Sequence, residues 1–225
     1  MIRVARGLAF VVGPPRPGRM HEGVPPGGAM VPELLAAANA AAGRPWDTPA
    51  VEHWGPITLS GTGTVGTDAG PIEIDGERVL RPTSRVGYVA LATGGPPASA
   101  PPFDPGGPIR VVPGPDPGFL AGSFRVGPVG NRVGVRLEGP PLTTQAIAAS
   151  TPVVRGAIQV PPSGELIVLG PEHPTTGGYP VVAVVCGADL GRLFARPPGA
   201  TVELVPISVV EARRASKGDP CVRSS

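Results

Sequence analysis

Short apolar runs bounded by glycine and proline dominate the hydrophobic pattern of this chain. Three of them follow one another closely, over residues 156–160, 165–169 and 181–186. Continuous apolar runs of this length, set between turn residues, are typical of strands that are buried on both faces. The stretch therefore predicts two strands joined by a turn, a polar glycine loop, a third strand and a short helix over 189–196.

Runs of the same kind recur along the rest of the chain. They predict strands over residues 2–12, 51–54, 57–59, 62–66, 71–74, 87–93, 109–113, 119–126, 132–137 and 201–205. Asp75-Gly76 is a tight-turn dipeptide and predicts a turn after the strand over 71–74. Many short strands separated by turns indicate an all-β chain.

A few short helices accompany the predicted strands. The helix over 32–42 has Pro32 in its first turn and Gly43 just past its end. A closing helix over 208–216 begins with Ser208 and carries Glu211 three residues later, which is the spacing of a capping box. The predicted fold class is therefore all-β with a few short helices.

Glycine and proline also divide the chain into parts. Residues 14–30 contain so many of both that no regular structure is expected there, and rigid loops of this length are usually functional or packed on a partner. The stretch 96–108 has the composition of a linker. The predicted organisation is an N-terminal β subdomain over 1–95, this linker, a C-terminal unit over 109–217 and a loose tail over 218–225.

The composition favours a folded chain over a disordered one. Of 225 residues, 34 are glycine and 33 proline, yet 41% are hydrophobic and the mean hydropathy is +0.14. That is enough apolar surface to offset the entropy lost on folding. The net charge of +2, the 4% aromatic content and the absence of a basic block argue against nucleic-acid binding. The apolar runs are too short to span a bilayer and no targeting signal is recognised, so a cytoplasmic protein without membrane contacts is expected.

Metal-ligating and reactive side chains are few. The histidines, His21, His53 and His173, are scattered and show no metal-type spacing with the cysteines. Cys186 lies inside an apolar run and is predicted to be a buried small hydrophobe, whereas Cys221 lies in the tail. No metal site is predicted.

The loop between the last two strands of the first stretch concentrates polar chemistry. Gly177 and Gly178 let the backbone adopt positive φ and let a ligand approach the amides, and the hydroxyls of Thr175 and Thr176 add further donors. Such a nest suits a carboxylate or phosphate, with the phenol of Tyr179 beside it. The alternative is a tight hairpin whose threonines satisfy their own turn.

Four further polar residues are candidates for substrate binding. Arg132 and Arg136 lie four apart on one predicted strand, so they share a face and can bind a carboxylate bidentately, or form a salt-bridged outer face with Glu138. Gln159 alternates out of an apolar strand and can read an amide edge or cap the turn. Asn39 either faces the glycine-rich loop or is a solvated or back-bonded helix residue.

Two residues are candidates for catalysis. Asp189 can act as a base or as a ligand to a phosphate-bound metal, but an Asp at this position is also a helix N-cap. His173 has an ordinary pKa suited to proton transfer, although a lone loop histidine is more often a surface residue.

Several of these segments, in this order, resemble the allophanate hydrolase subunit 2 family. That family includes the C-type subunit of 5-oxoprolinase, the Kip inhibitor-antagonist proteins and the C-terminal region of urea carboxylase. The resemblance is carried by GVPPGGAM (23–30), Ala38-Asn39 with Gly43, NRVGVRLEGP (131–140), GAIQVP (156–161), TTGGYP (175–180) and ADL (188–190). It is specific from about residue 132 to 212 and patchier over 16–43.

The resemblance implies a fold and a function. The fold would be a cyclophilin-like β-barrel in two related halves. The function would be that of a subunit which, with B-type and A-type partner subunits and ATP, opens the lactam of 5-oxoproline to glutamate. It also implies two alternatives: a regulatory subunit that pairs with a B-type partner without catalysis, and a carboxyl acceptor for a biotin-carrying partner.

The chain departs from the family in its N-terminal half. The usual Gln-Asp-x-Gly-Arg is VGPPR at 12–16, Val31 replaces an Asp, and no Gly-Ser-Arg-Ser-Thr segment follows Gly95. The C-terminal half keeps its polar set, so the resemblance implies the fold more firmly than the catalysis.

Overall fold

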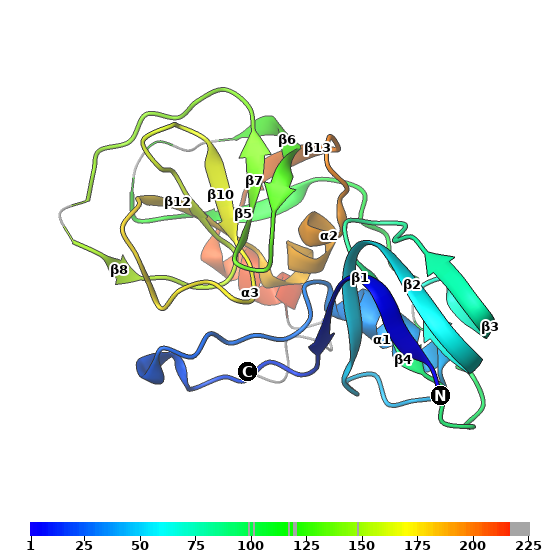
Figure 1. Ribbon diagram of the computed structural model, residues 1–225. Helices are drawn as coiled ribbons and strands as arrows, with labels where there is room; N and C mark the ends of the chain where they lie inside the picture. The colour runs from blue at the N-terminus through cyan, green and yellow to red at the C-terminus, as the bar shows by residue number, and fades with distance from the viewer. Residues whose placement is uncertain (99, 101, 117, 119–120, 148, 217–225) are drawn as a thin grey trace. The chain divides into compact units, whose positions relative to one another are not determined.

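The structure is a computed structural model that describes residues 1–98, 100, 102–116, 118, 121–147 and 149–216 (Figure 1). The tail predicted over 218–225, with Cys221, lies outside the described residues. By their contacts the residues group into two compact units, Met1–Pro15 with Gly28–Asp104, and Arg16–Gly27 with Pro105–Ser225. The predicted class, all-β with a few short helices and a β-barrel, is confirmed.

The first unit is an open sheet with one helix. Its strands run in the order β1-β2-β3, and β4 pairs with β2 in parallel. Its core is formed by aliphatic side chains of three of the strands, including Ile57, Leu59 and Ile74. The elements are β1 (Arg3–Val12), α1 (Pro32–Ala41), β2 (Ala50–Thr67), β3 (Gly70–Leu80) and β4 (Gly87–Leu91).

Two details of this sheet differ from the prediction. The three short strands expected between 51 and 66 form one strand, β2, and β4 pairs with residues near both of its ends. The turn expected at Asp75-Gly76 is wrong, because both residues lie inside β3 and pair with Thr62 and Gly61. The hairpin turn instead precedes Gly70, which has a φ of 122°.

Helix α1 packs on β2 through small residues. Pro32 lies in its first turn, as predicted, and Gly43 follows its end with a φ of 69°, a left-handed conformation that glycine adopts without strain. A Cβ on Gly66 of β2 would lie 2.2 Å from the carbonyl oxygen of Ala38. The helix can approach the strand this closely only because Gly66 has no side chain.

The second unit is a closed seven-stranded barrel. Its strands follow the order β10-β7-β6-β13-β5-β12-β9, with β13 and β5 parallel and the other barrel pairs antiparallel. They are β5 (Ile109–Pro113), β6 (Gly122–Gly130), β7 (Gly134–Glu138), β9 (Ala157–Gln159), β10 (Leu166–Leu169), β12 (Val181–Val185) and β13 (Thr201–Pro206). A separate two-stranded ladder joins β8 (Thr151–Pro152) to β11 (Thr176–Gly177).

Short helices accompany the barrel. They are the 3-10 turns Met20–Glu22 and Gly187–Asp189, α2 (Leu190–Ala195) and α3 (Val209–Ser216). The 3-10 turn at Met20–Glu22 corrects the expectation that residues 14–30 hold no regular structure. The capping box of α3 is confirmed, since Ser208 and Glu211 exchange hydrogen bonds. None of the helices in the described part of the chain has the length and apolar character needed to cross a bilayer.

Candidate functional site

The polar loop, residues 172–179, connects β10 to β12 at one end of the barrel. It contacts the glycine- and proline-rich segment Arg16–Gly27, which belongs to the same unit. Gly27 N donates to Pro171 O at 2.8 Å, and the Thr175 hydroxyl donates to Met20 O at 3.1 Å. The segment Arg16–Gly27, which belongs to the stretch expected to be a rigid loop, is thus packed against the polar loop with its predicted binding residues.

The side chain of Gln159 holds the polar loop through a hydrogen bond. This side chain is buried, and its Nε2 donates to Tyr179 O at 3.2 Å. A Cβ on Gly177 would lie 2.3 Å from the same nitrogen. Neither Gly177 nor Gly178 has a positive φ, so the predicted conformational reason for the glycine pair is wrong. Gly177 is needed because Gln159 occupies the space of a side chain.

The outer surface of the polar loop keeps groups that can reach a ligand. Thr176 and Gly178 are exposed, and Tyr179 is 42% exposed. The Thr176 hydroxyl makes no hydrogen bond to the residues that the structure describes. Thr175 differs, because its hydroxyl is bonded to Met20 rather than to its own turn, which corrects the hairpin alternative.

His173 belongs to the polar loop, but it is buried and does not reach the surface. Only 1% of the residue is exposed, so its interpretation as an ordinary surface histidine is wrong. Its Nδ1 lies 2.7 Å from Pro174 O. A carbonyl oxygen only accepts, so Nδ1 carries a proton and Nε2 is the acceptor of the neutral ring.

The two predicted arginines do not share a face. β7 begins only at Gly134, so Arg132 lies in the turn before the strand, where its Nε donates to Glu172 at 2.9 Å. Arg136 lies on β7 and pairs with Glu165, not with Glu138. Each guanidinium therefore has its own carboxylate, and the two do not form one carboxylate clamp.

Asp189 is fully buried at the far end of β12 from the polar loop. Arg110, on β5, donates to it from its backbone N, Nε and Nη2, each at 2.8 Å, and Arg192 Nη1 lies 3.2 Å away. Asp189 precedes α2 as predicted, but its side chain makes no capping hydrogen bond. Burial opposes the charged form, yet the hydrogen bonds and charge of Arg110, with the charge of Arg192, hold the pKa of Asp189 below its ordinary value.

Asn39 belongs to the first unit and fixes a turn. It is fully buried, and its Nδ2 donates to the backbone oxygens of Trp46 and Thr48 at 3.1 and 2.7 Å. Both predicted interpretations, a group facing the glycine-rich loop and a solvated or back-bonded residue, are therefore wrong.

Sequence reasoning missed the partners of these residues. Arg110, Glu165, Glu172 and Met20 each complete a contact of a predicted site residue. The only short-range indication of such a partner was that Arg110, a charged residue, lies inside an apolar strand. The pairings themselves join residues 29 to 155 positions apart, so no short-range pattern indicates them.

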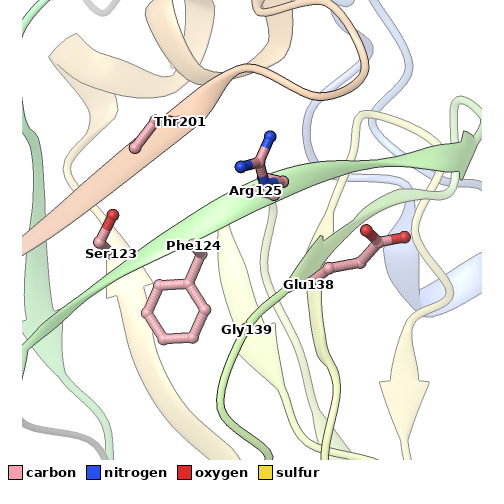
Figure 2. A pocket seen from close by; sticks show the side chains of 6 residues that line it. All are labelled: Ser123, Phe124, Arg125, Glu138, Gly139 and Thr201. Atoms are coloured by element: carbon pink, nitrogen blue, oxygen red, sulfur yellow. The ribbon is translucent and has the colours of Figure 1, made fainter.

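A second polar region lies on β6, β7 and β13. A pocket of about 330 Å³ is lined by Ser123, Phe124, Arg125, Glu138, Gly139 and Thr201 (Figure 2). Leu137 pairs with Leu166 at the start of β10, whereas the polar loop follows Leu169 at its end. The pocket and the polar loop therefore lie at opposite ends of these strands, and no predicted site residue lines the pocket.

Comparison with known proteins gives both a family and a fold. The family described as "Carboxyltransferase domain, subdomain A and B" matches residues 70–206. Residues of this chain are 35% identical over 118 residues to the C-type subunit of 5-oxoprolinase from Escherichia coli (strain K12), covering 48% of this chain and 38% of that protein. The Haemophilus influenzae protein of the same name is 38% identical over 86 residues, covering 37% and 28%.

Solved structures show the same architecture. The crystal structure of TTHA0988 matches with a TM-score of 0.70 and 24% identity, over 92% of this chain and 55% of that one. The Kluyveromyces lactis urea carboxylase matches with a TM-score of 0.78 and 20% identity, over 98% of this chain and 29% of that one. This chain thus corresponds to less than two thirds of each relative.

Proposed function

Because the chain belongs to the carboxyltransferase domain, subdomain A and B family, we propose that it acts like the C-type subunit of 5-oxoprolinase, as a component of a hetero-oligomeric, ATP-dependent hydrolase. The observation that carries this proposal is the match to two relatives that both bear the name of that 5-oxoprolinase component. The substrate is 5-oxoproline or a related lactam or amide, which the cytoplasmic complex opens to the amino acid. Water supplies the oxygen that the carbonyl carbon gains, and the ring nitrogen leaves as the amine. A second water accounts for the hydrolysis of ATP to ADP and inorganic phosphate.

The polar loop is the substrate-binding element in this proposal. Thr176 and Tyr179 are exposed on it, and Gly178 leaves the backbone accessible between them. A hydroxyl, a phenol and backbone amides are donors suited to the carboxylate of the substrate. Gln159 and Thr175 hold the loop in place.

His173 is the proton acceptor in this proposal. Its bond to Pro174 O leaves Nε2 as the basic nitrogen, within the loop that binds substrate. Asp189 is given no proton-transfer role, because Arg110 already occupies both of its oxygens. It acts by holding Arg110 in position.

We place ATP on the assembled complex, as a co-substrate, and not on this chain alone. Three arginines of the barrel, Arg110, Arg132 and Arg136, are each paired with a carboxylate. They therefore do not offer the uncompensated positive charge that a triphosphate requires. B-type and A-type subunits supply that charge in the proposal.

The test is reconstitution with B-type and A-type subunits, followed by measurement of 5-oxoproline-dependent ADP release. We expect release that needs all three chains, and a loss of at least about tenfold in Thr176→Val, because one substrate donor is removed. The matched control is Thr62→Val, an exposed threonine of β2 in the other unit. ADP release no greater than that of the partners alone would overturn the proposal.

A regulatory subunit is the second candidate. It is favoured by the partners that the structure gives to Asp189, Arg132, Arg136 and Asn39, which are all bound to protein groups. In this case the chain binds a B-type subunit, Thr176→Val leaves that binding unchanged, and no turnover depends on the chain. A turnover lost in Thr176→Val would exclude it. Carboxyl transfer from a biotin-carrying partner is a weaker third candidate, since the likeness to urea carboxylase extends to the fold alone.

A further inference from the structure

The pocket on β6, β7 and β13 places one positive and one negative side chain next to each other. Arg125 of β6 lies directly opposite Glu138 of β7 and Thr201 of β13 in the strand register. Side chains of directly opposed residues point to the same face, with Cβ atoms about 4.5–5.5 Å apart. A hydroxyl, a guanidinium and a carboxylate therefore form a row across three strands.

The two charged groups do not pair with each other. Arg125 Nη1 instead donates to Gly199 O at 3.4 Å, and Figure 2 shows the guanidinium and the carboxylate apart. Within the described residues no ion pair joins Arg125 to Glu138. Elsewhere on the barrel Arg110, Arg132 and Arg136 each meet a carboxylate. The charges of the pocket are thus open to a ligand.

Phe124 also lines the pocket, but it points to the opposite face of β6 from Arg125, as neighbouring residues of a strand do (Figure 2). Phe124 is 6% exposed, and a Cβ on Gly139 would lie 2.5 Å from its Cδ1. A Cβ on Gly122 would lie 3.1 Å from the same ring. Glycine on two sides leaves room for the ring on the inner face of β6, where Phe124 pairs with the buried Val202. The face that carries Arg125 and Glu138 is therefore polar.

We propose that this pocket binds a free α-amino acid. The ligand carboxylate binds Arg125, its ammonium binds Glu138, and the hydroxyls of Ser123 and Thr201 hydrogen-bond to the same two groups. A simple anion is repelled by Glu138 and a simple cation by Arg125, so only a zwitterion satisfies both.

This inference does not rest on the proposed function and goes beyond it. The pocket lies at the other end of β7 and β10 from the polar loop. Its volume of about 330 Å³ is at the lower end of the range for small-molecule sites, as a small amino acid requires. Exposed ion pairs contribute little energy each, so we expect a dissociation constant of about 1 mM.

Titration of the full chain, followed by NMR, tests the proposal without any partner subunit. The probes are glycine, L-alanine, L-leucine and L-glutamate, followed by the N-acetyl derivative and the methyl ester of the tightest one. We expect at least one amino acid to bind near 1 mM, and both derivatives to bind at least about tenfold more weakly, since each has lost one charge. No binding up to about 50 mM, or equal binding of the derivatives, would overturn the proposal.

Variants that remove one charge of the pocket test whether the amino acid binds there. Arg125→Gln and Glu138→Gln should each weaken the tightest amino acid at least about tenfold, because each removes one of the two charge-assisted contacts. The matched controls are Arg213→Gln on α3 and Glu77→Gln on β3, both exposed and outside the pocket. Unchanged binding in the pocket variants would place the amino acid elsewhere and refute the assignment.

Discussion

The two ends of β7 and β10 carry polar side chains that are used in different ways. At the end with the polar loop, Arg132 binds Glu172, Gln159 binds Tyr179 O, and Thr175 binds Met20 O. At the other end, Arg125 and Glu138 lie opposite each other on the neighbouring strands β6 and β7, and in the described part of the chain neither forms an ion pair. The first set of contacts is directed into the protein, and the second into a pocket.

This difference shows that a polar motif is not by itself an open site. A buried polar group has to find a partner, because leaving it unsatisfied costs about 1–3 kcal/mol. The polar loop meets this requirement with protein groups and leaves Thr176, Gly178 and Tyr179 exposed. The charged pocket residues are exposed, so water can satisfy them until a ligand replaces it. Mutations at the polar-loop end should therefore mainly change stability, and mutations in the pocket should mainly change ligand binding.

Gly170→Ala should destabilise the protein most strongly, through the polar-loop end of the barrel. A Cβ at this position would lie 2.4 Å from the backbone oxygen of Arg132, and a backbone atom cannot rotate away. We expect the free energy of unfolding to fall by about 3 kcal/mol, as for overpacking of a close-packed site. Denaturant unfolding measures this. The matched control is Gly178→Ala, whose Cβ would have its nearest neighbour, Ser150 Oγ, at 3.6 Å; an equal loss in both variants would contradict the explanation.

Asp189→Asn should have the next largest effect and should depend on pH. The variant keeps the shape but removes the charge that Arg110 and Arg192 bind. We expect a loss of about 2 kcal/mol at neutral pH, which is less than for a fully buried pair because water can reach Arg110, 36% exposed.

The sign of the pH dependence follows from the lowered pKa of Asp189. Its stabilisation is complete above the unfolded-state pKa of about 3.9 and is lost as the pH falls through the folded-state pKa. The difference in stability between wild type and Asp189→Asn should therefore narrow below about pH 4. Unfolding curves from neutral pH down to about pH 3 measure it. A constant difference over that range would show that the charge of Asp189 is not responsible.

Thr175→Val should loosen the contact between the polar loop and the segment Arg16–Gly27. It removes the hydrogen bond to Met20 O while keeping the shape of the side chain. We expect a loss of about 1 kcal/mol and faster amide exchange at Gly27, whose N–H binds Pro171 O. Thr176→Val is the matched control and should leave both quantities unchanged, since its hydroxyl is exposed. Faster exchange in both variants would rule out a specific role of Thr175.

Glu138→Gln should have the smallest effect on stability. Its carboxylate is exposed and forms no ion pair within the described residues, so we expect a change within about 0.5 kcal/mol. The same unfolding experiment measures it. A loss comparable to that of Asp189→Asn would show that Glu138 is a structural residue, and would remove the contrast between the two ends of the barrel.

Patterns that extend over a few residues predicted the local elements well. Val181–Val185 and the strands before it lie where the apolar runs indicate, and Ser208 caps α3 as its spacing to Glu211 predicts. Cys186 is buried, as expected. These features depend on neighbours in the chain, which the sequence displays directly.

Residue roles that depend on distant partners were predicted less well. Asp189 was expected to be an N-cap or a catalytic group, but Arg110, which lies 79 positions away, binds it. Arg132 and Arg136 were placed on one face, because the start of β7 at Gly134 could not be located from an alternating pattern. Element boundaries are the hardest feature to locate from local patterns, and here a shift of two residues changed the role of an arginine.

The class of the fold, the buried strands and the family to which the polar motifs belong can be inferred from the chain alone. Apolar runs, turn residues and capping residues act over short distances along the chain, so local patterns reveal them. Which polar groups remain exposed to a ligand depends instead on the folded structure. Closing the barrel brings Glu172, Glu165, Arg110 and Met20 to the predicted site residues, and within the described residues it leaves Arg125 and Glu138 without an ion pair. Strand register sets that distribution, and register is a property of pairs of distant segments.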